Sequence, residues 1–219
     1  MERNESAAAM EWMKARKIIA IARGLEPEHM VRLARALYDG GIDLIEVTFS
    51  QSRPDTWEDT ANAIRAIGRE LAGKALPGAG TVMTERQLVM AAEAGARYII
   101  TPNTDAALIR RVKELGLLAF PGAMTPSEIT AAYRAGADAV KVFPAGELGP
   151  QYIKALRAPL SQIPLMAVGG VNERNAADFL AAGCMGVGVG GNLVRKDLIA
   201  AGEWDRLTRI ARDYRKAVA

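Results

Sequence analysis

The sequence contains one histidine and one cysteine, and this scarcity excludes several common kinds of catalytic site. A zinc site of the usual type takes most of its ligands from His and Cys, so it cannot be assembled here. His29 follows Pro27 in the predicted first turn of a surface helix, far from any nucleophile signature, which disfavours Ser-His-Asp and Cys-His mechanisms. Cys184 cannot form an internal disulfide, which fits a reducing cytoplasm. Any chemistry must therefore use Lys, Glu, Asp, Thr and backbone groups.

The sequence also lacks a strong charge imbalance and long apolar runs. Its 28 basic and 25 acidic residues give a net charge of +3, with no basic cluster interleaved with aromatic residues, so we expect no nucleic-acid partner. No apolar run approaches the roughly 18 residues of a membrane span, and the first five residues do not resemble the start of a signal peptide. We therefore expect a soluble cytoplasmic protein without a membrane partner.

What the sequence does have is a regular alternation of apolar runs and helical patterns. Strands are predicted at 17–23, 42–49, 79–82, 97–102, 117–122, 139–144, 164–170 and 186–191. Helices are predicted at 7–15, 27–38, 56–71, 84–94 and 105–115, from Thr125 onward, and at 203–218. Glycines close four helices just before a strand, at Gly40-Gly41, Gly95, Gly136 and Gly183. Eight strand-helix units favour a single (β/α)₈ TIM barrel over residues 1–219, with a short N-terminal helix, over an open doubly wound sheet.

Lys141 is the most informative residue, because it interrupts the apolar run from Ala139 to Pro144. A strand that is apolar on both faces is typical of a covered parallel sheet, and burial there disfavours the ammonium form of a lysine. A lysine with a lowered pKa among apolar side chains is suited to Schiff-base chemistry on a carbonyl substrate. The alternative is a lysine whose amine reaches solvent or a surface carboxylate at the strand end.

Other residues share the position of Lys141 at the predicted carboxyl ends of strands, where the active sites of such barrels lie. They are Arg23, Glu46, Thr81, Pro102, Pro121-Gly122, Gly169-Gly170 and Gly190-Gly191. Glu46 interrupts a second apolar strand, and by alternation it faces the same side as Thr48. A buried carboxylate beside a buried amine can move the protons that imine formation and carbon–carbon cleavage require. A purely structural ion pair between Glu46 and Lys141 is the alternative.

Two glycine pairs follow the seventh and eighth predicted strands, at Gly169-Gly170 and Gly190-Gly191. In a TIM barrel the backbone N–H groups of these two loops, together with a short helix N-terminus, form the usual phosphate site. Either pair alone could be no more than a turn. Their occurrence at both expected places predicts phosphate binding.

The chain carries an ordered set of short motifs that resembles one known family. The motifs are Glu46–Thr48, Gly78–Val82, Thr101–Asn103, Pro121-Gly122, Thr125–Glu128, Lys141–Pro144, Gly169–Val171 and Gly188–Gly190. They resemble, from Lys17 to the last helix, the 2-keto-3-deoxy-6-phosphogluconate aldolases, which are also described as 2-keto-4-hydroxyglutarate aldolases.

The resemblance implies a class I aldolase that uses no metal or cofactor, usually as a homotrimer. Such an enzyme cleaves a phosphorylated keto sugar acid to pyruvate and glyceraldehyde 3-phosphate. It also implies that Lys141 forms the pyruvate imine and that Glu46 moves protons through a water molecule. Thr81 and Pro102 are then expected at the pyruvate end, and Gly169-Gly170 at the phosphate. Further candidates for substrate binding are Arg23, Phe143, Gly190 and Gly191.

Two positions depart from the family pattern. Ser50 stands where many members have an arginine that helps to hold a carboxylate, and Gly191 stands where a serine is common. Arg23 is a possible substitute for the missing arginine, as in the branch that resembles 2-keto-3-deoxy-6-phosphogalactonate aldolases. That branch also resembles this chain at Thr101–Asn103 and Gly149–Leu156. The sequence therefore leaves the preferred sugar acid open.

Two other functions remain compatible with the same residues. In the first, Glu46 catalyses a phosphosugar isomerisation or epimerisation without an imine. In the second, the barrel is a catalytically silent oligomeric scaffold.

Overall fold

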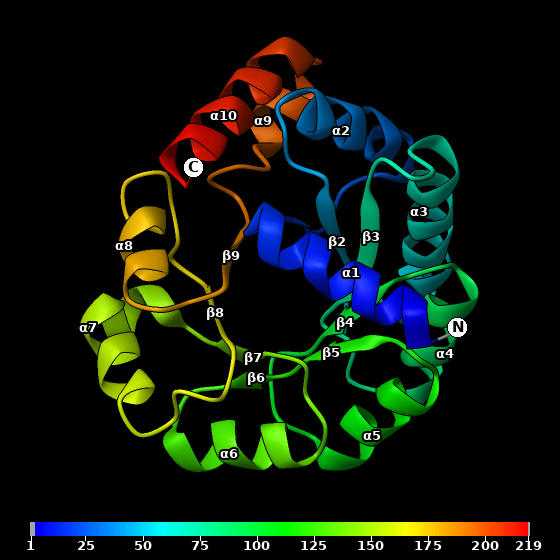
Figure 1. Ribbon diagram of the computed structural model, residues 1–219. Coiled ribbons are helices and arrows are strands. Elements are labelled where there is room, and N and C mark those ends of the chain that lie inside the picture. Colours follow the sequence, from blue (N-terminus) through cyan, green and yellow to red (C-terminus); the bar gives the residue numbers. More distant parts are fainter. Residues whose placement is uncertain (1–2, 219) are drawn as a thin grey trace.

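Short apolar strands and amphipathic helices alternate around a barrel in the computed structural model, which describes residues 3–218 (Figure 1). The strands are β1 (Ile18–Ala22), β2 (Leu44–Thr48), β3 (Leu76–Gly80), β4 (Tyr98–Ile100), β5 (Leu118–Phe120), β6 (Gly122–Ala123), β7 (Val140–Val142), β8 (Leu165–Val168) and β9 (Gly186–Val189). All the paired strands are parallel, in the order β5-β4-β3-β2-β1-β9-β8-β7-β6. This arrangement confirms the predicted (β/α)₈ barrel.

The two ends of this strand order belong to one stretch of chain that closes the barrel. Pro121 separates β5 from β6, and proline has no N–H to donate to a neighbouring strand. The backbone still joins both neighbours, because Phe120 O accepts from Thr101 N (3.4 Å) and Pro121 O accepts from Lys141 N (2.9 Å). β5 and β6 together therefore correspond to the single fifth strand that the sequence predicts.

The helices lie outside the barrel, apart from the first. They are α1 (Arg3–Arg16), α2 (Pro27–Asp39), α3 (Trp57–Glu70), α4 (Glu85–Glu93), α5 (Ala106–Glu114), α6 (Pro126–Arg134), α7 (Ala145–Arg157), α8 (Ala176–Ala181), α9 (Lys196–Ala200) and α10 (Trp204–Ala217), with a short 3₁₀ helix at Pro54–Thr56. Thr84 and Thr125 start α4 and α6 with reciprocal capping boxes. The four helix-ending glycines have φ values of 87° at Gly41, 90° at Gly95, 108° at Gly136 and 106° at Gly183, a conformation that glycine adopts without steric cost.

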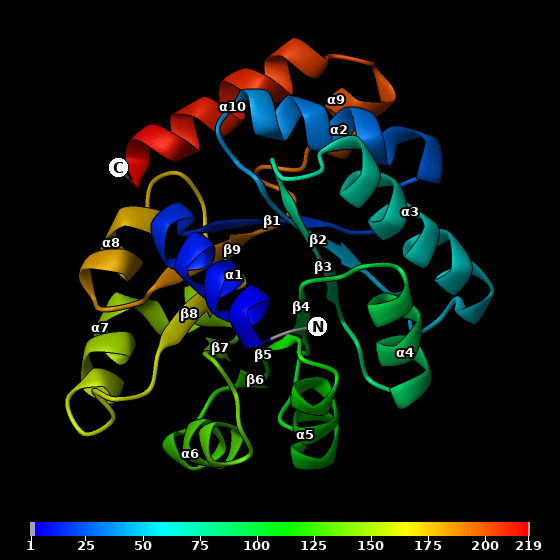
Figure 2. The ribbon, with the colours of Figure 1, turned by 45° about the vertical axis from the view of Figure 1, so that its right-hand side comes forward.

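Two apolar cores support this architecture. The larger one lies between the strands and the surrounding helices. The smaller one fills the inside of the barrel with inward-facing residues such as Leu44, Tyr98 and Phe120, and Ala9 and Met13 of α1 complete it. α1 therefore closes one end of the barrel, and Figure 2 shows it crossing that end. The carboxyl ends of the strands lie at the other end and remain free for a site.

The prediction for the third strand is wrong in position. The sequence predicts a lead-in at 75–78 and a strand at 79–82, whereas β3 runs from Leu76 to Gly80. Pro77 and two glycines have low strand propensity, so the sequence of this segment resembles that of a loop. All five of its residues are nevertheless buried, and β3 pairs along its whole length with β2.

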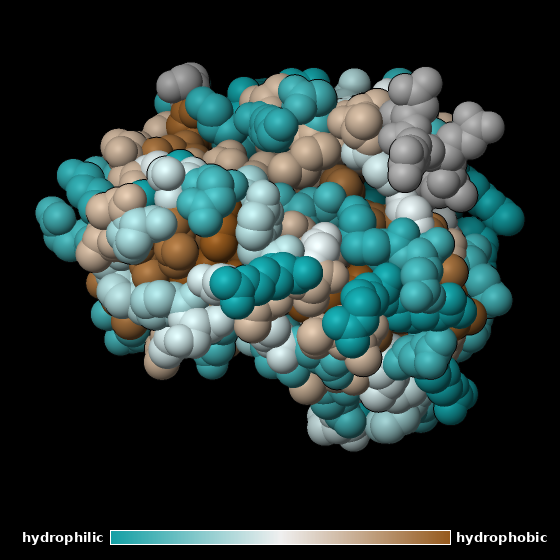
Figure 3. Space-filling model, turned by 60° about the horizontal axis from the view of Figure 1, so that its bottom comes forward, coloured by the Kyte–Doolittle hydropathy of each residue, from teal (hydrophilic) through white to brown (hydrophobic). Residues whose placement is uncertain are grey.

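The outer surface is that expected for amphipathic helices packed on a barrel. Seen from the side of α5 and α6, it is mostly hydrophilic, with apolar side chains showing between the polar ones (Figure 3). Within residues 3–218, no helix has the length and hydrophobicity needed to cross a bilayer.

Candidate active site

Lys141 lies in the middle of β7 and points into the barrel. Val140 and Val142 on either side belong to the outer core, so alternation along the strand turns Lys141 inward. Its side chain is buried, with 7% of the residue exposed, and Nζ lies 4.8 Å from the centre of the Phe143 ring. Burial lowers the pKa of the Lys141 amine, Arg23 lowers it further, and the negative charge of Glu46 opposes both effects. A larger share of the amine is therefore neutral and nucleophilic than in an exposed lysine.

Glu46 lies in the middle of β2 and is even more deeply buried, with 1% of the residue exposed. Burial raises the pKa of this carboxyl group, while the positive charges of Lys141 and Arg23 oppose the rise. Its Oε2 has no hydrogen-bond partner in the part of the chain that the structure describes. A carboxyl group with a raised pKa and a free oxygen can both accept and return a proton.

The alternative of a structural ion pair between these two residues does not fit the geometry. Among the described residues, no nitrogen and carboxylate oxygen of Lys141 and Glu46 come within 4.0 Å, although each is the largest charge effect on the pKa of the other. Both groups line the same cavity without forming a direct ion pair with each other. Other ion pairs in the molecule are direct contacts, such as Arg16 Nε to Asp43 Oδ2 at 2.8 Å.

The cavity that contains both groups has a volume of about 480 Å³. It is lined by Ile21, Arg23, Glu46, Thr81, Pro102, Lys141, Phe143, Val168, Gly169, Gly170, Val171, Gly188, Gly190, Gly191 and Asn192. All ten residues that the sequence predicts for the site are in this group. Sequence reasoning missed the other five. Alternation along the strand could have identified Ile21, two residues before Arg23, and Val168 at the end of β8. Asn192 could have been identified because it directly follows the glycine pair Gly190-Gly191.

Arg23 and Thr81 form the wall between this cavity and a larger neighbouring chamber. Arg23 Nη2 donates to Thr81 Oγ1 at 3.2 Å, and Gln51 Nε2 donates to the Thr81 carbonyl at 2.6 Å. Thr81 has a φ of 54°, a left-handed conformation that is strained for a residue other than glycine. The contacts from Arg23 and Gln51 hold Thr81 in this conformation at the mouth of the cavity.

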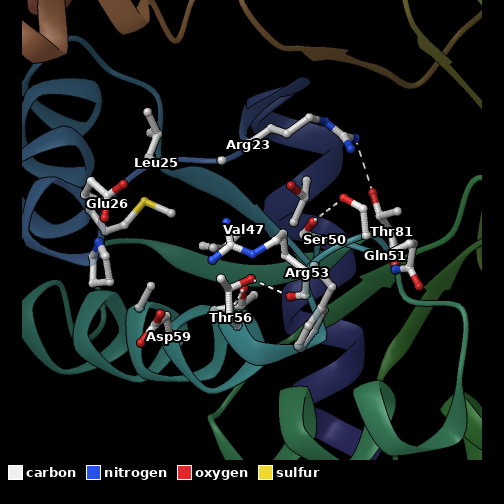
Figure 4. Close-up of a pocket in the computed structure, with 18 residues that line it drawn as sticks. Arg23, Leu25, Glu26, Val47, Ser50, Gln51, Arg53, Thr56, Asp59 and Thr81 are labelled. Atoms are coloured by element: carbon white, nitrogen blue, oxygen red, sulfur yellow. Dashed lines mark hydrogen bonds between the residues drawn. The ribbon is translucent and has the colours of Figure 1, made fainter.

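The neighbouring chamber has a volume of about 660 Å³ and lies between the loops that follow β1 and β2 (Figure 4). Arg23 and Thr81 line both spaces, but Lys141 and Glu46 line only the smaller one. Ser50, which stands where an arginine is common in the family that the sequence resembles, lines the larger chamber. The two buried ionisable groups therefore lie in the smaller cavity, and the larger chamber adjoins it at Arg23 and Thr81.

The two glycine loops meet at the rim of the cavity that contains Lys141 and Glu46. The Asn192 side chain donates to the Val171 carbonyl at 3.3 Å, which joins the loop after β9 to the loop after β8. The Asn175 side chain donates to the Gly170 carbonyl at 3.1 Å. A Cβ atom added at Gly190 or Gly191 would meet no atom within 4 Å, so an anion can approach the backbone N–H groups there.

Gly80 on β3 provides the space that Glu46 occupies. A Cβ atom at Gly80 would lie 1.7 Å from Glu46 Oε1 and 2.4 Å from its Cδ, far inside van der Waals contact. We expect Gly80→Ala to displace the carboxylate and to lower kcat by about 10²-fold, the lower end of the range for a general acid–base group. Steady-state kinetics will measure this.

Gly68→Ala is the matched control, because a Cβ there meets only Pro77 Cγ at an ordinary 3.6 Å inside α3. A folded Gly80→Ala protein with a kcat within about twofold of the parent would show that the position of Glu46 is not critical.

Comparisons with known proteins give consistent results for the sequence and for the fold. Residues 9–210 match the family model described as KDPG and KHG aldolase. The chain is 38% identical to the 2-dehydro-3-deoxy-6-phosphogalactonate aldolase of Escherichia coli K12, over 95% of this chain and 100% of the relative. A solved structure described as native KDPGal is 39% identical, with a TM-score of 0.81 over 91% of this chain and 93% of the other.

A second solved structure resembles the chain at lower identity. It is the KDPG aldolase of Legionella pneumophila, with pyruvate captured at low pH as a covalent carbinolamine intermediate. That protein is 27% identical, with a TM-score of 0.82 over 93% of this chain and 96% of the other.

Proposed function

Because this chain belongs to the KDPG and KHG aldolase family, we propose that it is a class I aldolase that works through a Schiff base on Lys141. It cleaves a 2-keto-3-deoxy-6-phospho sugar acid, or 2-keto-4-hydroxyglutarate, to pyruvate and an aldehyde such as glyceraldehyde 3-phosphate. One observation carries the assignment of roles. The buried amine of Lys141, whose pKa is lowered, faces the same cavity as the buried carboxyl of Glu46, whose pKa is raised.

The proposed reaction begins at the C2 ketone of the substrate. The neutral amine of Lys141 adds to C2 to form a carbinolamine, which loses water to give an iminium ion. Glu46, acting through a water molecule, removes the proton of the C4 hydroxyl. The C3–C4 bond then breaks, the C4 oxygen becomes an aldehyde, and the bonding electrons form the enamine of pyruvate. Protonation of C3 and hydrolysis of the imine release pyruvate and restore the amine.

The remaining residues of the cavity fit the two ends of such a substrate. Arg23 lines the same cavity, and its positive charge lowers the pKa of both reactive groups, so we assign it to the carboxylate in place of the arginine that is absent at Ser50. Thr81, Pro102 and Phe143 line the pyruvate end. The loops at Gly169-Gly170 and Gly190-Gly191 offer backbone N–H groups to the phosphate.

The test of this function is to trap the imine. We expect incubation with pyruvate and borohydride to add one reduced pyruvate to the protein, at Lys141 in the peptide map. The same preparation should cleave at least one of three substrates, the two C4 epimers of the phosphorylated acid and hydroxyglutarate, and the values of kcat/KM rank them. A folded protein that forms no adduct would exclude the imine and favour isomerisation or epimerisation by Glu46. An adduct without cleavage of any substrate would favour the scaffold.

We also propose that the chain acts as one barrel domain and assembles as a homotrimer in the cytoplasm. Phe143, Met83 and Met124 are large apolar residues with 40–45% of their surface exposed, and they follow β7, β3 and β6 at the end of the barrel that carries the site. Large apolar side chains exposed at one end of a domain are candidates for an interface with other proteins. Native mass spectrometry of the trapped sample will show whether the assembly contains three chains.

A further inference from the structure

Tyr98 places a polar group in the apolar interior of the barrel, below the reactive residues. It is the first residue of β4 and belongs to the inner core, with none of its surface exposed. Its ring packs against Phe120, with the ring centres 6.0 Å apart at an angle of 48°. A phenylalanine would fill the same space, so packing alone does not explain the hydroxyl group.

The neighbouring strand is shaped to admit this ring. A Cβ atom at Gly78 would lie 2.2 Å from Cε2 and 2.4 Å from Cδ2 and Cζ of Tyr98. Gly78 and Gly80, two residues apart on β3, thus make room for Tyr98 and for the carboxyl of Glu46, respectively. The same face of one strand receives the tyrosine and the proposed proton carrier.

The register of the strands brings these two side chains close to each other. Glu46 is the partner of Gly78 in the pairing of β2 with β3. Neighbouring strands lie about 4.8 Å apart, so the Tyr98 ring over Gly78 lies beside the backbone of Glu46, and the Glu46 carboxyl group lies over Gly80, two residues further along the same strand face. Burial raises the pKa of the Tyr98 hydroxyl, and the negative charge of Glu46 adds more to this rise than that of Asp43 does.

Both side chains carry a polar atom that is buried without a partner. Among the residues described, neither Tyr98 Oη nor Glu46 Oε2 makes a hydrogen bond. An unpaired donor and an unpaired acceptor inside a protein each cost free energy that a hydrogen bond between them recovers. A hydroxyl donor and a carboxylate acceptor are complementary, whereas the surrounding inner core is apolar.

We propose that Tyr98 is a positioning residue for Glu46, its hydroxyl group donating a hydrogen bond to the Glu46 carboxylate through one bridging water molecule. This inference rests on the proposed role of Glu46 as the proton carrier. Tyr98 does not line the substrate cavity and acts only through the carboxylate. It keeps its own proton throughout the reaction, because burial and the charge of Glu46 raise the pKa of its hydroxyl well above the ordinary value.

The proposal predicts a direction for the pH dependence of turnover. A donor favours the charged form of a carboxylate, so Tyr98 lowers the pKa of Glu46 and offsets part of the rise caused by burial. The other charges that face Glu46 are Lys141 on β7 and Arg23 after β1, and Asp43 lies beyond Tyr98. At saturating substrate the Lys141 nitrogen is held in the imine, so the acidic limb of kcat reports Glu46.

Tyr98→Phe is the decisive variant, because it keeps the ring and removes only the hydroxyl. We expect the acidic limb of the kcat profile to move upward by about one pH unit, with kcat near that of the parent on the alkaline side of the limb. Trapping of pyruvate by borohydride should be unchanged. Tyr133→Phe, at an exposed position on α6, is the matched control and should leave the limb where it is.

Stability gives a second readout that does not depend on turnover. If Tyr98 donates to the carboxylate, the parent exceeds Tyr98→Phe in free energy of unfolding at pH values above the raised pKa of folded Glu46, where the carboxyl group is charged. This advantage disappears as the pH falls and Glu46 is protonated in the folded state. An active Tyr98→Phe enzyme with an unshifted limb, and a stability difference that does not vary with pH, would overturn the proposal. Failure of the parent to bind pyruvate would instead reject the aldolase function.

Discussion

Lys141→Met is expected to abolish aldol cleavage and to leave the protein folded. Methionine is similar to lysine in length and lacks the amine that forms the imine, so no covalent path to the enamine remains. The apolar interior that lowers the pKa of the Lys141 amine accepts a thioether without an unpaired charge. Removing Lys141 also takes away the cation with the largest effect on Glu46, whose pKa then rises further, and the carboxyl takes up a proton instead of remaining charged.

Three measurements test this expectation together. Turnover of the phosphorylated keto acid should fall to the background rate, pyruvate and borohydride should give no adduct, and the circular dichroism spectrum should match that of the parent. Lys74→Met is the control, since Lys74 is exposed in the turn before β3. Substantial residual cleavage by folded Lys141→Met protein would refute the imine mechanism.

Much of the fold could be predicted because the residue types in most segments suit the positions that these segments take in the barrel. Apolar runs marked the buried strands, and glycines marked the turns that lead into them, as at Gly95 and Gly136. The prediction failed at β3, where local signals and tertiary demands conflict. Gly78 and Gly80 have poor strand propensity, yet any larger side chain there would overlap Tyr98 or Glu46. The sequence of a single strand does not reveal what its neighbours place against it.

The site could be predicted at positions where a charged residue interrupts an otherwise apolar strand. Lys141 and Glu46 each interrupt an apolar strand, and the carboxyl ends of the strands converge at one end of a barrel. What could not be predicted is how the reactive groups are supported. Tyr98 reads as an ordinary core aromatic, and only the barrel shows that its hydroxyl is unpaired near Glu46. The hydrogen bond from Arg23 to Thr81 likewise joins segments 58 residues apart in the chain.

Glu46→Gln should lower kcat by about 10²–10⁴-fold, the usual contribution of a positioned acid–base group. Glutamine preserves the shape of the side chain but cannot accept the proton of the C4 hydroxyl through water. The imine with pyruvate should still form in this variant, because the amine of Lys141 remains. Burial lowers the pKa of that amine, and the charge of Glu46 opposes the effect, so its loss lowers the pKa further. The adduct should consequently persist to lower pH in the variant than in the parent.

Comparing adduct formation with aldol cleavage in the two variants separates the role of Lys141 from that of Glu46. Adduct formation should be retained in Glu46→Gln and absent in Lys141→Met, while cleavage is lost in both. Glu93→Gln, at an exposed position on α4, provides the control for a change of charge alone. A Glu46→Gln enzyme with a higher KM and an unchanged kcat would mean that Glu46 binds the substrate and does not move its protons. In that case the buried carboxyl would serve as a fixed counter-charge to the iminium ion, and the base would have to be sought among the other polar groups of the cavity.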